Sequence, residues 1–195
     1  MRITGGEFCG RPLAVPGSDA IRPTQDRVRA ALFNILSPVV AGADFLDLFA
    51  GTGAVGIEAL SRGARRATFV EAAQRHAAAV RSNLERLGAS DRADVVRADA
   101  YRWAAGYSGE GFGIAFADPP YALGEERGYA SVLATLASRG VVREGGLFVA
   151  EMTSVQRTEE TPGWELLRDR TYGRTRLCVW RRLQAGYCAA MPKRV

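Results

Sequence analysis

The tetrapeptide Asp118-Pro119-Pro120-Tyr121 contains the residue types best suited to chemistry. Two consecutive prolines stiffen the backbone and remove N–H donors, which leaves carbonyl oxygens as acceptors beside the Asp118 carboxylate. A carboxylate and a carbonyl can accept both hydrogens of an exocyclic amine, and Tyr121 offers a ring on which a base can stack. The tetrapeptide therefore predicts a site that positions the amino group of a nucleobase, with a merely rigid loop as the alternative.

A glycine-rich turn supplies a second set of candidates, because residues 50–56 match the pattern GxGxxG. Glycines let such a turn tighten and let the backbone approach a ligand. Glu71 follows Gly51 by twenty residues, a spacing at which an acid accepts hydrogen bonds from ribose hydroxyls. The pattern fits several nucleotide-like cofactors. The alternatives are a plain tight turn and a solvated acid at a helix start.

Further acids follow or end apolar runs of the sequence. Asp47 precedes the glycine turn, and Asp99 follows a third apolar run, where it could accept from an adenine amino group or cap a helix. Together with Glu71 and Asp118 they predict an acidic pocket in a basic protein. Such a pocket suits a cationic cofactor that serves an anionic polymer, and S-adenosyl-L-methionine (AdoMet) carries a sulfonium charge.

The elements that must position these residues alternate along the chain. Short apolar runs predict strands and amphipathic periods predict helices, so the middle of the chain predicts a parallel sheet with helices on both faces. Ligands of such sheets bind beyond the carboxyl ends of the strands. The expected strands begin at Phe45 and span 67–71, 93–99, 113–120 and 145–151, and the expected helices span 24–36, 54–62, 73–87 and 125–138.

The two ends of the chain differ from this alternation. Residues 1–22 contain short apolar pieces between Gly and Pro, which predict a small β-hairpin extension, and the arginines of this stretch make RNA binding its expected role. Two extended runs that meet at Gly173 predict a closing hairpin, so the domain of residues 23–183 is expected to be α/β with a mostly parallel seven-stranded sheet. Residues 184–195 are expected to form a disordered tail.

Composition narrows the class of protein. The 195 residues include 26 basic and 21 acidic ones, and 25 of the basic residues are arginine, which favours a nucleic-acid partner unless it reflects compositional bias alone. Three widely spaced cysteines and one histidine argue against a disulfide framework and a metal site. No apolar run is long enough for a membrane span, and the first residues do not resemble a signal peptide, so a cytoplasmic protein is expected.

The motifs resemble those of known enzymes. DLFAGTG resembles the first motif of class I AdoMet-dependent methyltransferases, and DPPY resembles the motif of those that methylate exocyclic nitrogens of bases. The segments RITGGEFCGRPLAVPG, IRPTQDRVRAALFNIL and FLDLFAGTGAVGIEALSRGA, in this order, resemble the RsmD family of bacterial 16S ribosomal RNA (guanine-N2)-methyltransferases. The similarity covers about residues 1–182.

The resemblance implies a Rossmann-like class I methyltransferase fold, AdoMet as cofactor without a metal, and guanine 966 of 16S rRNA, in the usual ribosomal numbering, as target. It implies a 30S particle or its RNA as partner. No obligate protein partner and no membrane are expected, and a monomer is the default expectation. The implied catalytic residues are Asp118, Pro119, Pro120 and Tyr121, and the expected cofactor-binding residues are Asp47, Ala50, Gly51, Gly53, Glu71, Asp99 and Ala100. The resemblance implies RNA contacts at Arg22, Thr24, Arg27 and Arg29, and the basic charge of the N-terminal stretch adds Arg2 and Arg11.

Three alternatives stay open at this point. DPPY also serves enzymes that methylate adenine N6 or cytosine N4, and the residue chemistry alone does not select guanine. An NAD-dependent oxidoreductase fits GxGxxG with an acid twenty residues on, although it leaves DPPY unexplained. A non-catalytic RNA-binding protein on a methyltransferase fold fits the basic charge but not the acidic pocket.

Overall fold

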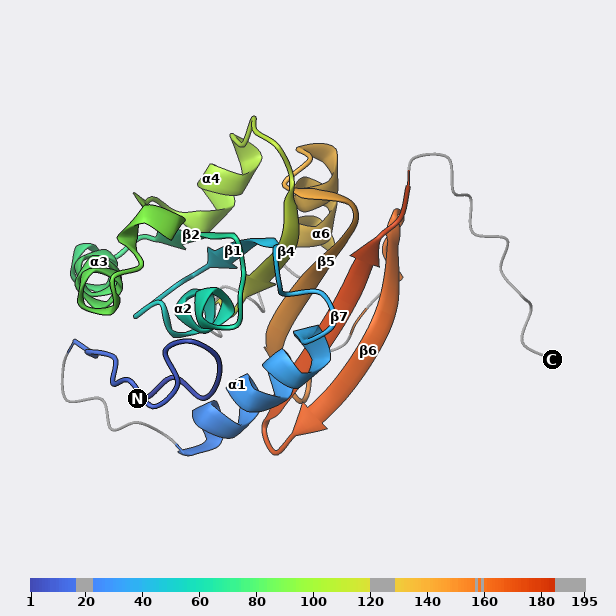
Figure 1. Cartoon of the computed structure of the whole chain (residues 1–195). Coiled ribbons are helices and arrows are strands. Elements are labelled where there is room, and N and C mark those ends of the chain that lie inside the picture. Colours follow the sequence, from blue (N-terminus) through green and yellow to red (C-terminus); the bar gives the residue numbers. More distant parts are fainter. Residues whose placement is uncertain (17–22, 120–128, 157, 159, 185–195) are drawn as a thin grey trace.

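The computed structural model describes residues 1–16, 23–119, 129–156, 158 and 160–184, which form a twisted sheet covered by helices on both faces (Figure 1). None of the helices within these residues has the length and apolar character needed to cross a membrane. The elements are α1 (Pro23–Leu36), β1 (Asp44–Leu48), α2 (Ala54–Ser61), β2 (Arg66–Glu71), α3 (Gln74–Leu87), the short 3₁₀ helix η1 (Ser90–Arg92), β3 (Ala93–Arg97), α4 (Ala100–Ala105), β4 (Phe112–Ala117), α6 (Tyr129–Ser138), β5 (Val142–Thr153), β6 (Trp164–Tyr172) and β7 (Thr175–Arg182).

The sheet has seven strands among the described residues, in the order β3-β2-β1-β4-β5-β7-β6. The five strands from β3 to β5 pair in parallel, as expected, whereas β7 is antiparallel to both β5 and β6. The prediction of a mostly parallel sheet is therefore only partly confirmed, because the C-terminal hairpin contributes two antiparallel strand pairings. The turn of that hairpin contains Gly173, which adopts a φ of 63°.

Two apolar cores hold the helices on the sheet. Side chains of α1, α2 and α3 pack on one face, where Phe45, Phe69 and Phe116 of the central strands are buried. Side chains of α4 and α6 pack on the other face against Leu46, Phe148 and their neighbours. Alternate residues of the same strand thus serve opposite cores, which is the arrangement expected for a strand that is buried on both sides.

The elements differ from the sequence prediction in several places. Strands β3 and β4 end at Arg97 and Ala117, before the expected ends at 99 and 120. Helix α4 was not predicted, because its six residues are too few for a clear amphipathic period. Strand β5 begins at Val142 rather than at 145, and the chain passes through a register shift opposite β4 there. The predicted helix of residues 125–138 is seen as α6 from Tyr129 on, and residues 125–128 lie outside the described part of the chain.

The predicted β-hairpin of residues 1–22 is present only as a short antiparallel pairing within residues 1–16, and residues 17–22 lie outside the described part of the chain. An antiparallel bridge joins Arg2 to Pro12, and the Ile3 N–H donates to the Arg11 carbonyl at 3.1 Å, but no regular strand forms on either side of the turn. The apolar side chains Ile3, Phe8 and Leu13 of this segment are buried in the same core as α1 and α2, so the segment is packed into the domain. The expected tail from residue 185 onward lies outside the described residues.

Glu58 of α2 anchors this N-terminal segment. Its carboxylate is fully buried and accepts hydrogen bonds from the Thr4 N–H at 3.1 Å and the Arg29 Nε at 2.8 Å. Arg62, one turn later on α2, donates to the other carboxylate oxygen at 2.9 Å. One side chain therefore joins the N-terminal segment, α1 and α2.

Candidate active site

The glycine turn lies between the carboxyl end of β1 and α2. Gly51 and Gly53 adopt φ values of 56° and 78°, the left-handed region that side chains disfavour. A Cβ on Gly56 would stand 2.3 Å from the ring of Phe69, so the third glycine of the pattern lets α2 lie against β2. The tight turn leaves room for a ligand, because no atom lies within 4 Å of where a Cβ on Gly51 would be.

Asp47 supports the turn from beneath. Its side chain is buried, and its Oδ2 accepts a hydrogen bond from the Gly56 N–H, in the first turn of α2, at 2.9 Å. Burial raises the pKa of this carboxyl to about 7, and the carboxylates of Asp118 and Glu71 add to the rise. Asp47 therefore changes charge near neutral pH.

This raised pKa predicts how pH affects stability. Folding disfavours the ionised form of Asp47, so ionisation of this residue lowers the free energy of unfolding. The loss is absent below pH 3.8, grows as pH rises and reaches its full value above about pH 7. We expect Asp47→Asn, whose amide oxygen can still accept from Gly56, to gain stability over the parent by on the order of 3 kcal/mol between pH 5 and pH 8. Urea unfolding at several pH values measures this difference, and parallel profiles for the two proteins would contradict it.

Glu71 ends β2 and braces the same turn. Its carboxylate accepts hydrogen bonds from the Gly51 N–H at 2.8 Å and from the Ala73 N–H at 2.7 Å. Glu71, the acid twenty residues after Gly51, therefore lies against the glycine turn. The sequence spacing did not predict the direct hydrogen bond between Glu71 and Gly51. A ribose held here would share a carboxylate that is already oriented by the backbone.

Asp99 and Ala100 lie at the start of α4. Asp99 is the N-cap of the helix, and its Oδ1 accepts a hydrogen bond from the Arg102 N–H at 2.9 Å. The capping role considered for Asp99 is therefore present in the structure, and it leaves Oδ2 of the exposed carboxylate able to accept from a ligand. Ala100 is buried behind it.

The carboxylates of three strands meet in one pocket. A cavity of about 200 Å³ lies between the N-terminal half of α1 and the glycine turn, and its walls include Asp47, Asp118 and Glu151. Burial of the carboxyl raises the pKa of Asp118 to about 6, and burial together with Asp118 raises that of Glu151 to about 8. Asp118 is nonetheless exposed to solvent at the open side of the pocket. Within the described residues, no cluster of His, Cys, Asp or Glu is arranged to hold a metal ion.

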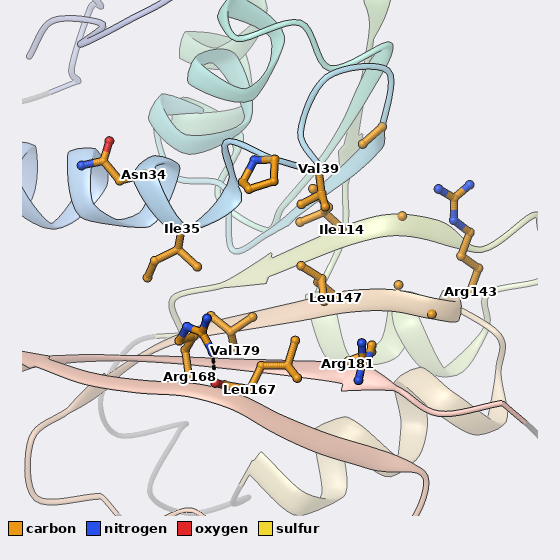
Figure 2. Close-up of a pocket in the computed structure, with 15 residues that line it drawn as sticks. Asn34, Ile35, Val39, Ile114, Arg143, Leu147, Leu167, Arg168, Val179 and Arg181 are labelled. Carbon is orange, nitrogen blue, oxygen red and sulfur yellow. Dashed lines mark hydrogen bonds between the residues drawn. The ribbon is translucent and has the colours of Figure 1, made fainter. Parts of the chain in front are cut away.

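A larger cavity of about 630 Å³ lies at the opposite edge of the sheet (Figure 2). Ile35 near the end of α1 points toward Leu147 and the hairpin strands across it. Its lining contains arginines but no carboxylate, cysteine or histidine. We therefore place the chemistry in the smaller pocket, which lies at the carboxyl ends of the parallel strands and holds the acids.

The expected RNA-binding residues divide into two groups. Arg2, Arg11 and Arg27 are exposed, in keeping with the expectation. Arg29 is not at the surface: only 4% of its side chain is exposed, and its guanidinium donates to Glu58 and to the Arg2 carbonyl. Its buried ion pair corrects the expectation of a surface contact, although the residue also lines the pocket.

Some of the expected residues lie outside the description. Arg22, Pro120 and Tyr121 are not among the described residues, and Thr24 is described only as part of the backbone of α1. Pro119 is described and is buried directly after Asp118. Glu151, by contrast, was not predicted as a site residue, although it belongs to the apolar run GGLFVAE and could have been found by examining the end of each predicted strand.

Comparison with known proteins yields relatives over nearly the whole chain. Ribosomal RNA small subunit methyltransferase D of Escherichia coli strain K12 is 37% identical over 189 residues, which cover 95% of this chain and 92% of that protein. Bacillus subtilis YlbH is 36% identical over 185 residues, which cover 93% of this chain and 99% of that protein. The solved structure of Escherichia coli yhhF matches with a TM-score of 0.83 at 36% identity and covers 94% and 98% of the two chains.

These matches confirm the predicted class I methyltransferase fold. The family model described as Conserved hypothetical protein 95 matches residues 1–181, which include the N-terminal segment, the glycine turn, Asp118 and the C-terminal hairpin. The extent of this match and the identity to the E. coli and B. subtilis proteins agree with the resemblance given by the sequence motifs. The chain therefore belongs to the RsmD family.

Proposed function

We propose that this protein transfers a methyl group from AdoMet to the exocyclic N2 of a guanine in the RNA of the small ribosomal subunit. The observation that carries the proposal is the position of Asp118, which follows β4, directly precedes Pro119 and lines the acidic pocket together with the glycine turn. The RNA of the small subunit is proposed because the E. coli relative is named for it. Guanine N2, at position 966 of the RNA, is the finer part of the proposal and rests on the resemblance of the motifs.

The residues around the glycine turn fit AdoMet. The open space above Gly51 admits a ligand close to the backbone, and Glu71 offers a fixed carboxylate to the ribose hydroxyls. The free Oδ2 of Asp99 and the N–H of Ala100, at the first position of α4, suit the amino group and ring nitrogen of adenine. Asp47 and its acidic neighbours favour a cationic ligand. When bound, AdoMet supplies an electrophilic methyl group on sulfur.

Asp118 and Pro119 position the amine that receives the methyl group. The lone pair of the guanine amine is delocalised into the ring, so the nitrogen is a poor nucleophile. Hydrogen bonds from its two N–H groups to the Asp118 carboxylate and the Pro119 carbonyl hold the nitrogen in line with the methyl group and raise its electron density. A C–N bond forms as the C–S bond breaks, and the proton then leaves the nitrogen with the Asp118 carboxylate within reach.

Labelled-methyl transfer from AdoMet tests this proposal. The substrates are 30S particles and naked 16S RNA from a strain that lacks its own enzyme, and the product is digested to nucleosides. Label in N2-methylguanosine is the expected result, and the better substrate shows whether the assembled subunit is recognised. Label in a methylated adenosine or cytidine would keep the transfer chemistry but reject guanine. Absence of AdoMet binding would reject the methyltransferase proposal.

The exposed arginines of the N-terminal segment and α1 yield a further prediction. Arg11 and Arg27 carry permanent charges that can neutralise phosphates, and each neutralised phosphate steepens the dependence of affinity on salt. We expect Arg11→Ala with Arg27→Ala to weaken RNA binding and to reduce the slope of log affinity against log salt by roughly 1.5. Arg139→Ala, at an exposed position after α6 on the other face of the sheet, is the control. An unchanged slope would place the RNA on another surface.

A further inference from the structure

Glu151 is the acid in the pocket to which the proposed reaction assigns no role. It lies near the carboxyl end of β5, the strand next to β4, and lines the same cavity as Asp118. The two carboxylates are close enough that Asp118 raises the pKa of Glu151. A second carboxylate in this position costs free energy, since like charges oppose each other in a partly buried site.

The order of the strands places Glu151 on the base side of the pocket. Glu71 and the glycine turn follow β2 and β1, Asp118 follows β4, and Glu151 lies one strand farther in the same direction. The groups suited to the cofactor therefore lie on one side of Asp118, and Glu151 lies on the other. A base enters from the side of Asp118 that faces away from the cofactor. When its exocyclic amine reaches Asp118, the ring nitrogen next to that amine lies toward Glu151.

Two neighbours fix Glu151 in place. The hydroxyl of Tyr129 donates to the Glu151 carbonyl oxygen at 2.9 Å, and Thr175 of β7 donates a side-chain hydrogen bond to the carboxylate. The bond from Thr175 favours the ionised form, but burial and Asp118 outweigh it and raise the pKa of Glu151 to about 8. A further N–H donor, such as one from a substrate, is therefore needed to hold the carboxylate of Glu151 ionised at neutral pH.

The three bases with an exocyclic amine differ at the ring nitrogen next to it. Guanine presents the N1–H donor beside its N2 amine, whereas adenine N1 and cytosine N3 are acceptors beside theirs. An ionised carboxylate attracts the first arrangement and repels the other two. The protonated carboxyl can instead donate to an acceptor, so the discrimination is largest above about pH 8, where Glu151 is ionised. Sites built to pair with a polar group of the substrate discriminate strongly, because the wrong substrate leaves a buried group without its partner.

We propose that Glu151 is the residue that selects guanine, by accepting a hydrogen bond from its N1–H while Asp118 and Pro119 hold the N2 amine. This inference rests on the proposed function and supplies the base recognition that the DPP segment leaves open. Glu151 contacts the base but not the methyl group. Its loss therefore alters the choice of base, whereas the loss of Asp118 removes the transfer itself.

The test uses the full-length protein and small-subunit RNA that carries either guanine or 2-aminopurine at the nucleotide found to be labelled. 2-Aminopurine keeps the amine at C2 but has an acceptor at N1. At about pH 8.5, above the pKa of Glu151, we expect the parent protein to favour guanine by on the order of 10³-fold in kcat/KM. In Glu151→Gln, whose amide can donate to N1, guanine is expected to lose about 10²-fold and 2-aminopurine to gain, so that the ratio falls by at least 10²-fold.

Two controls separate the possible outcomes. Glu110→Gln removes an exposed carboxylate at the amino edge of β4 and should leave the ratio unchanged. AdoMet affinity, measured by titration, should be the same in the parent and in Glu151→Gln. Equal losses on both bases would show a structural role for Glu151 and overturn the inference, as would a parent that prefers 2-aminopurine. A parent that methylates no guanine in the native RNA would instead reject the proposed function itself.

Discussion

Asp118→Ala is expected to lower kcat/KM for methyl transfer by about 10²- to 10³-fold while AdoMet still binds, because preorganised contacts to a reacting group contribute this much. The carboxylate stands at the open side of the pocket, and among the described residues none donates a hydrogen bond to it. Its removal therefore leaves the glycine turn, Glu71 and Asp99 intact. The loss should appear in the transfer step and not in the affinity for the cofactor.

Transfer of labelled methyl to RNA and titration of AdoMet measure the two quantities separately. Asp118→Asn is the matched variant, because its amide oxygen can accept one N–H bond but cannot take a proton. In the parent, activity should fall as pH drops through about 6, since protonation of Asp118 removes an acceptor. The Asn variant should lack this acidic limb. Turnover of the Ala variant within tenfold of the parent would remove Asp118 from the reaction.

Glu58→Ala is expected to reduce the free energy of unfolding by about 3–5 kcal/mol, the cost of removing one partner from a buried ion pair. The substitution leaves the guanidinium of Arg29 buried without its ion-pair partner on α2. It also removes the hydrogen-bond acceptor of the Thr4 N–H. Because Arg29 also lines the pocket, the wall formed by α1 should loosen as well. Urea denaturation at neutral pH measures the loss.

The matched control is Glu7→Ala, which removes the exposed ion pair between Glu7 and Arg92. Exposed pairs contribute at most about 1 kcal/mol, so the control should unfold close to the parent midpoint. Glu58→Gln, which keeps an acceptor oxygen but loses the charge, should fall between the two. If Glu58→Ala and Glu7→Ala lower the free energy of unfolding equally little, apolar packing alone holds the N-terminal segment, α1 and α2 together.

Much of the parallel half of the fold could be predicted because its signals are local. DFLDLFA, ATFVE and GIAFA are short apolar runs bounded by glycine or charged residues, and each becomes a strand of the sheet. The topology rule for such sheets then brings Asp47, Glu71 and Asp118 to one edge, where the structure has them near one another. The rule needs only the position of each residue along its strand.

The contacts that could not be predicted join residues far apart in sequence. Arg29 looked like one more surface arginine among 25, and nothing local reveals a fully buried Glu58 twenty-nine residues away. The N-terminal segment packs into the core, which could not be predicted for a related reason. Its apolar residues follow no strand period but fill gaps in a core, and a Cβ on Gly6 would stand 1.8 Å from the Ser61 carbonyl oxygen.

The irregular edge strand has a consequence for how the protein behaves in concentrated solution. β6 ends the sheet, and nine residues of extended backbone at a sheet edge are a template on which a second chain can add. The register shift between Leu166 and Arg168 interrupts that template, and Arg168 and Arg170 place exposed like charges along it. We therefore expect Arg168 and Arg170 to oppose edge-to-edge association of two sheets, whether or not RNA is bound.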